Sequence, residues 1–269
     1  MICRLLGHKS KFLYVKARKS AFLCFCNANL SKMKNEGRSL PIISYFCPPK
    51  TLVPMSLPFF KQNTNKISYM ILPEGIRKDF DDGLKGLSEK HGVSIVVLED
   101  VNWNDDLTPW PAEGVFKKAK PFGGKAAAFL NKLTHEIIPN TERDLGIENA
   151  ERTLLGVSLS GLFAVWSTFN TDAFANIISI SGSLWYDGFV EWMKEQTSSP
   201  QMEKVCMLLG EKEKNSKEKR MSTVEERTVA AANILKAKSH AAVLFELVEG
   251  THFSPIMPRL QRAFEVVYG

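Results

Sequence analysis

Apolar runs alternate with amphipathic segments over most of the chain. A continuous apolar stretch at residues 93–98 is typical of a strand covered on both faces, and further strand candidates lie at 67–72 and 177–180. Similar strand patterns lie at 151–155, 205–209 and 242–248, and helical spacing of apolar residues lies at 80–91, 126–138, 224–235 and 257–267. The helix over 126–138 is expected to end near Pro139, and residues 40–62 are expected to hold leading strands. The alternation predicts an α/β fold: a mainly parallel sheet covered by helices on both faces.

The sharpest local pattern is a Gly-x-Ser turn between an apolar run and a helical one. Gly156 lies two residues before Ser158, and Ser160 and Gly161 follow. This spacing is typical of a nucleophile elbow, the strained strand-to-helix turn of α/β-hydrolases, which needs small residues around its serine. Ser158 is therefore the candidate nucleophile rather than a simple turn serine. Ser160 is a competing hydroxyl, but its register places it at the small-residue position facing the sheet.

A serine nucleophile needs a base and an orienting acid, which in this fold follow in the order serine, acid, histidine. His252 follows the last predicted strand and precedes the last predicted helix, which favours a base over a surface loop histidine. Glu211 and Glu213 follow the strand that ends at Gly210. Either glutamate fits the acid, and a Ser–His dyad without a firm acid is the further alternative. His91, His135 and His240 lie in or beside predicted helices and are expected to be structural or solvated.

The residues of the oxyanion hole and of the substrate pocket are less clearly indicated by the sequence than the nucleophile and the base. The backbone N–H of Leu159, directly after the nucleophile, is the expected first oxyanion donor. The second is expected from the loop after the early strand, at Glu74, because the preceding Pro73 has no N–H. Trp110 and Trp185 follow loops at the same predicted edge of the sheet, and each is interpreted either as pocket lining or as core packing.

Charge and cysteine content limit the class of protein. The net charge of +6 reflects residues 1–35, which hold eight of the 35 basic residues and no acid, so the remainder carries 27 basic against 29 acidic residues. That balance gives no support for nucleic-acid binding. No apolar run is long enough for a membrane span. The five cysteines form no Cys-x-x-Cys pair, which favours a reducing, cytoplasmic environment and gives no metal site.

The predicted domain organisation is a basic N-terminal extension over residues 1–40, poorly ordered, followed by one α/β-hydrolase domain over 41–269. A targeting segment is the alternative interpretation of the extension. The length of 269 residues suits one such domain.

Several segments together resemble the family called "putative esterase", which includes enterobactin and bacillibactin esterases and S-formylglutathione hydrolase. They are Leu107-Thr108-Pro109-Trp110, the elbow, Ser181-Gly182-Ser183-Leu184-Trp185-Tyr186, the Gly210–Asn215 stretch and Gly250-Thr251-His252-Phe253. The resemblance covers about residues 65–267, but the second elbow glycine is replaced by Ser160. It implies that Glu213, three residues past Gly210, is the triad acid.

The resemblance implies a serine esterase that needs no metal or organic cofactor. Its expected partner is a small-molecule ester, with a siderophore-type ester favoured and a carbohydrate acyl ester or a thioester as the alternative. No nucleic-acid or membrane partner is expected, and the sequence does not indicate an oligomeric state. A catalytically silent binding protein with the same fold is the alternative of another class.

Overall fold

A computed structural model describes residues 12–17, 20–25, 59–73 and 80–269. The chain divides into two compact units, residues 1–53 and 54–269. In the first, strands β1 (Phe12–Ala17) and β2 (Ser20–Phe25) pair antiparallel. The expected lack of order over residues 1–40 falls mostly outside the described residues and stays a prediction.

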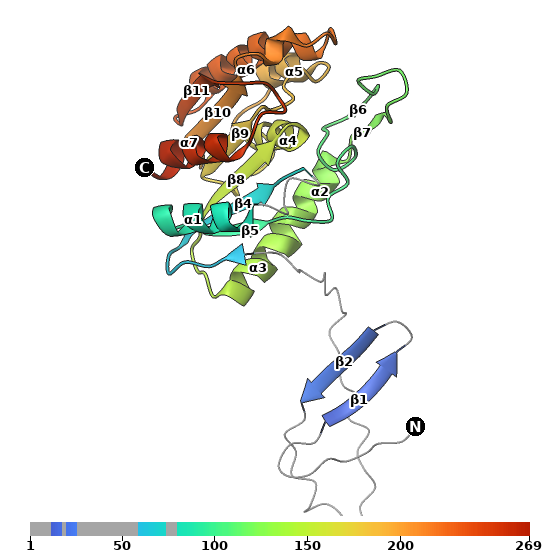
Figure 1. The fold of residues 1–269 in the computed structure, drawn as a ribbon, viewed down its shortest axis with the longest axis vertical. Helices are drawn as coiled ribbons and strands as arrows, with labels where there is room; N and C mark the ends of the chain where they lie inside the picture. Colours follow the sequence, from blue (N-terminus) through green and yellow to red (C-terminus); the bar gives the residue numbers. More distant parts are fainter. Residues whose placement is uncertain (1–11, 18–19, 26–58, 74–79) are drawn as a thin grey trace, which may run out of the picture. The chain divides into compact units, whose positions relative to one another are not determined.

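The second unit is built on a seven-stranded sheet in the order β11-β10-β9-β8-β4-β5-β3 (Figure 1). Pairing is parallel throughout except for β3, which runs antiparallel to β5. The strands are β3 (Phe59–Phe60), β4 (Lys66–Ile71), β5 (Ser94–Val97), β8 (Glu151–Val157), β9 (Asn176–Ile180), β10 (Lys204–Gly210) and β11 (Ala242–Val248). The predicted α/β-hydrolase-type sheet is thus confirmed, and of the leading strands expected over 40–62 the described residues contain β3.

Helices cover both faces of this sheet and bury two separate apolar clusters (Figure 1). On one face α1 (Asp81–His91) and α7 (Met257–Tyr268) pack on alternate strand residues such as Met70, Leu155 and Ile178. The other cluster includes residues of α2 (Ala126–Lys132), α4 (Leu159–Ser167), α5 (Phe189–Glu195) and α6 (Val224–Lys238). None of the helices in the described part of the chain combines the length and hydrophobicity needed to cross a bilayer.

The predicted end of a helix near Pro139 is wrong. After α2 the chain forms a π-helical turn (Leu133–Ile137) and continues as α3 (Ile138–Leu145). The N–H of Ile138 bonds to the carbonyl of Leu133, five residues back, so the turn is widened before a proline that lacks an N–H. Pro139 therefore falls in the first turn of α3, where a missing donor is tolerated. The helix ends at Leu145 and is capped by Gly146, whose φ is 63°.

Short elements complete the unit around the carboxyl ends of the strands. Strands β6 (Pro111–Ala112) and β7 (Phe122–Gly123) form a small antiparallel pair in the β5–α2 connection. Two 3₁₀ turns, η4 (Glu213–Asn215) and η5 (Met221–Thr223), follow β10. In an open parallel sheet this edge is where a binding site forms.

Candidate active site

Ser158 lies at the tight turn between β8 and α4. Its φ of 62° and ψ of −121° are values that residues other than glycine rarely adopt, and they match a strained nucleophile elbow. A Cβ at Gly156 would collide with the Ser160 backbone, and one at Gly161 would lie 2.9 Å from the Cα of Gly182. Both glycines are therefore needed for the close approach of strand and helix.

Ser160 occupies the small-residue position of the elbow and faces away from the candidate site. It is fully buried; its Oγ accepts a hydrogen bond from the Val157 N–H at 2.7 Å and lies 2.7 Å from the Ile71 carbonyl. The hydroxyl thus links the elbow to strand β4. These contacts explain how a serine can replace the usual glycine: its extra oxygen is fully engaged by backbone groups.

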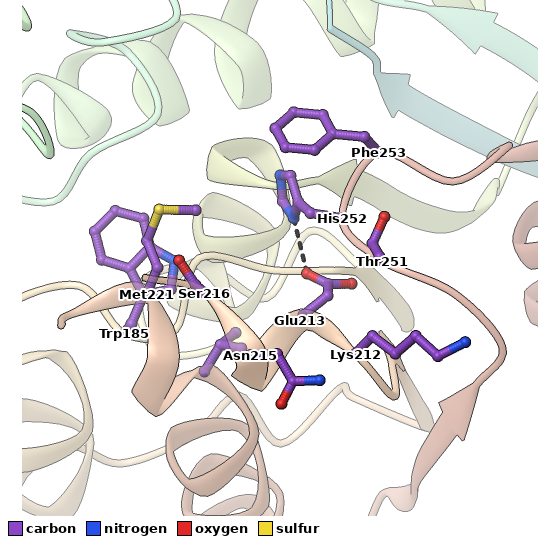
Figure 2. A pocket seen from close by; sticks show the side chains of 10 residues that line it. Trp185, Lys212, Glu213, Asn215, Ser216, Met221, Thr251, His252 and Phe253 are labelled. Atoms are coloured by element: carbon purple, nitrogen blue, oxygen red, sulfur yellow. Dashed lines mark hydrogen bonds and ion pairs between the residues drawn. The ribbon is translucent and has the colours of Figure 1, made fainter. Parts of the chain in front are cut away.

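Three candidate residues from separate loops meet in one chain of hydrogen bonds. His252 Nε2 lies 3.1 Å from Ser158 Oγ, and His252 Nδ1 lies 2.8 Å from Glu213 Oε2. Figure 2 shows the His252 ring directed at the Glu213 carboxylate. The side chain of Glu213 is 4% exposed, whereas that of Glu211 is 48% exposed and pairs with Lys212. The structure therefore places Glu213, not Glu211, beside the imidazole.

The environment of Glu213 favours its ionised form. Burial would raise the pKa of this carboxyl, but hydrogen bonds from His252, Ser181 and the Gly210 N–H outweigh it and leave the pKa below its ordinary value. An ionised carboxylate can only accept, so His252 Nδ1 carries the proton. In the neutral imidazole Nε2 is then the acceptor, placed to take the proton of Ser158.

Arg259 and Ser181 also hold Glu213. Ser181 belongs to one of the family-like segments, but sequence analysis assigned a role to neither residue. Arg259 Nη1 donates to Ser181 Oγ at 2.7 Å and lies 3.4 Å from Glu213 Oε1, and its guanidinium is buried. Burial lowers the pKa of Arg259, and Glu213 opposes that shift. The available signal was periodicity: Arg259 lies four residues before Ala263 and eight before Val267, within the apolar stripe of α7.

The expected oxyanion donors are only partly within the described residues. Leu159 is the first residue of α4, where backbone N–H groups are unpaired within the helix. Glu74, the expected second donor, lies outside the described residues. Ser183 lies close to the nucleophile: its N–H donates to the Ser158 carbonyl at 3.0 Å, and the two hydroxyl oxygens are 3.5 Å apart.

A pocket of about 420 Å³ opens beside the His252 ring (Figure 2). Its apolar wall is formed by Trp185, Met221, Val224 and Phe253, and its polar lining includes Lys212, Asn215, Ser216 and Thr251. Trp185 thus lines the pocket, as one interpretation of the sequence expected. Trp110 instead packs against Tyr186, Phe189 and Trp192, which is the core-packing alternative.

The geometry can be compared with known proteins. Residues 80–251 match the model of a family described as "Putative esterase". The chain belongs to this family. Membership supports ester hydrolysis as the class of activity, and the fold matches that of serine hydrolases.

The individual proteins that this chain resembles share at most 29% sequence identity with it in the following examples. "Uncharacterized protein YbbA" of Bacillus subtilis (strain 168) is 29% identical over 147 residues, which is 54% of this chain and 59% of that protein. The chain thus spans about three fifths of the length of this curated relative. An IroE-like serine hydrolase from Shewanella oneidensis has a TM-score of 0.62 at 21% identity over 76% of this chain and 70% of that one. The siderophore hydrolase EstA from Aspergillus nidulans has a TM-score of 0.55 at 18% identity over 77% and 84%.

Proposed function

We propose that the protein is a serine esterase that cleaves a carboxylic ester through an acyl-enzyme. The observation that carries this proposal is the chain of contacts from Ser158 Oγ to His252 Nε2 and from His252 Nδ1 to Glu213. A serine hydroxyl is a weak nucleophile until an aligned base removes its proton. The strained turn at Ser158 and the low pKa of Glu213 both support such a role.

The reaction follows from these contacts. Ser158 Oγ attacks the ester carbonyl while His252 Nε2 takes its proton. The tetrahedral oxyanion then accepts a hydrogen bond from the Leu159 N–H. His252 then gives the proton to the leaving alkoxide, and the C–O bond breaks to leave an acyl-serine. A water molecule then attacks the acyl carbonyl while His252 takes its proton. The bond between Ser158 Oγ and the acyl carbon breaks, His252 returns the proton to Oγ, and the carboxylic acid leaves. Glu213 holds the imidazole in the Nδ1–H tautomer and stabilises the imidazolium.

The proposed substrate class is a siderophore-type ester that carries aromatic groups. The pocket presents Trp185 and the exposed Phe253 beside His252, with the Lys212 cation in its lining. Flat aromatic groups stack on such rings, and a cation favours acidic phenols or carboxylates. The solved relatives named as siderophore hydrolases agree with this choice. A carbohydrate acyl ester or a thioester is the second candidate, and a silent binding protein is the alternative of another class.

An ester panel read as kcat/KM separates these candidates. The panel contains a short p-nitrophenyl ester, a feruloyl ester, an acetylated sugar, an acyl thioester and a catecholate trilactone. The proposal predicts measurable turnover of the activated ester and the highest kcat/KM for the trilactone. A higher kcat/KM for the acetylated sugar or the thioester would show that the substrate is of that class instead. If no substrate is turned over, the silent binding protein is favoured.

A further inference from the structure

Arg259 is held in a position that the triad alone does not explain. The residue lies in the first turn of α7 and is 3% exposed, although arginine is rarely buried without a specific partner. Its contacts lie on the side of the Glu213 carboxylate away from His252: Nη1 donates to Ser181 Oγ at 2.7 Å and lies 3.4 Å from Glu213 Oε1. Because Ser181 Oγ in turn donates to Glu213 Oε1 at 2.7 Å, the guanidinium polarises a hydrogen bond to the acid.

The same guanidinium also holds the loop that carries the base. Arg259 Nη2 donates to the carbonyl of Thr251 at 2.6 Å, and Thr251 directly precedes His252. Gly210 and Gly250 leave the space for this contact: a Cβ on Gly210 would lie 2.8 Å from Arg259 Nη2, and Gly250 has φ 107°. One planar cation therefore contacts both the acid and the backbone beside the base.

We propose that Arg259 is a positioning residue of the active site, which aligns the Glu213 carboxylate and the His252 loop and limits the negative charge that Glu213 presents to the imidazole. The inference rests on the proposed function, since the alignment matters for a Ser158–His252–Glu213 triad. Arginine suits this role because its rigid fork donates in two directions at once, which an ammonium group does not reproduce.

The charged groups around the imidazole set the expected pH effect. In the described part of the chain they include Glu213 and Arg259, Lys212, which lines the pocket and pairs with Glu211, and Arg220, whose guanidinium lies 5.7 Å from the ring centroid of the pocket residue Trp185. Removing the cation of Arg259 strengthens the field of Glu213 on protonated His252. The acidic limb of the kcat/KM profile should therefore move to higher pH, which a purely structural loss of folding would not produce.

The experiment compares Arg259→Met and Arg259→Lys with the matched control Arg262→Met. Arg262 lies on the same helix, one turn further, and pairs with Glu246 at the surface. We normalise kcat to the sites that a fluorophosphonate labels at the end point. This kcat should fall about 10- to 100-fold in Arg259→Met with KM little changed, by analogy with the residues that orient the ligands of metal sites. The acidic limb of the kcat/KM profile should move to higher pH in Arg259→Met. It should stay in place in Arg259→Lys, which retains the positive charge but has a lower kcat than the wild type. Arg262→Met should match the wild type.

Failure of this inference differs from failure of the proposed function. If the wild type is labelled and active but Arg259→Met retains wild-type kcat and pH profile, the positioning role is wrong. If Arg259→Met does not fold, Arg259→Lys decides, and unchanged kcat in that variant would equally overturn the proposal. If the wild type is neither labelled nor active, the esterase assignment itself fails.

Discussion

Replacing Glu213 with glutamine tests the assigned acid with almost no change in shape. Glu213 Oε1 lies 2.7 Å from Ser181 Oγ and 2.8 Å from the Gly210 N–H, and both groups donate to it. The glutamine oxygen should occupy this position, so the amide NH₂ should face His252 Nδ1. A donor there forces the proton onto Nε2, and the imidazole can no longer accept the proton of Ser158.

The expected loss follows from this wrong tautomer. In the serine-protease triad the same carboxylate-to-amide change lowers kcat about 10⁴-fold, which corresponds to about 5.4 kcal/mol of transition-state stabilisation. We expect a loss of this order in kcat of Glu213→Gln, with KM little changed. Steady-state kinetics on one activated ester at pH 7–8 measure it.

Glu211→Gln is the control, because Glu211 is two residues away, half-exposed and paired with Lys212. Its kcat should remain within about twofold of the wild type, since an exposed ion pair contributes little. Equal small effects in both variants would refute the acid assignment and favour a Ser–His dyad. A large loss in Glu211→Gln alone would show that the solution structure of this loop differs from the one described.

Three further perturbations test the surrounding structure. Ser160→Ala leaves the buried Val157 N–H without its acceptor and should lower the free energy of unfolding by about 1–3 kcal/mol in urea titrations while kcat is retained. Ser167→Ala, which removes only a donor to the Ala164 carbonyl in the same helix, should cost less, and equal losses would contradict this account. The lowered pKa of Glu213 means that its ionised form stabilises the fold above the ordinary glutamate pKa of about 4.3 and that this contribution is lost as the pH falls further. The stability difference between wild type and Glu213→Gln should thus shrink from pH 7 to pH 3, and a constant difference would argue against it. Phe253→Ala should raise KM for aromatic esters more than for acetyl esters without changing Tm, because the ring is 89% exposed at the pocket; equal KM changes would remove it from the site.

Much of the fold was predictable because the strands carry unambiguous patterns. The runs in β4, β5 and β9 are buried at nearly every position, and most of their residues are apolar, as double-sided burial favours. The elbow was predictable because close strand–helix contact leaves few choices besides small residues at Gly156 and Gly161. Parallel topology then brings the carboxyl ends of β10 and β11 beside β9 and β8, which explains why His252 and the pair Glu211 and Glu213 could be proposed from their positions after strands. The choice of Glu213 over Glu211 came from the family resemblance.

The remaining features depend on tertiary contacts that a local pattern does not contain. Helical periodicity places Arg259 on the apolar stripe of α7, but it does not reveal the partner, because the buried carboxylate that makes this position favourable lies on another loop. The helix passes Pro139 because one turn widens before it. Trp110 follows a loop, as a pocket residue would, but neighbouring aromatic rings of α5 take it into the core.

The most direct test of the central claim is covalent labelling of intact protein by a fluorophosphonate, read by mass spectrometry and peptide mapping. The account predicts one equivalent of label on Ser158, lost in Ser158→Ala, strongly slowed in His252→Ala, and retained in Ser160→Ala and Ser183→Ala. Absence of labelling in the wild type, or full labelling that persists in Ser158→Ala, would contradict it.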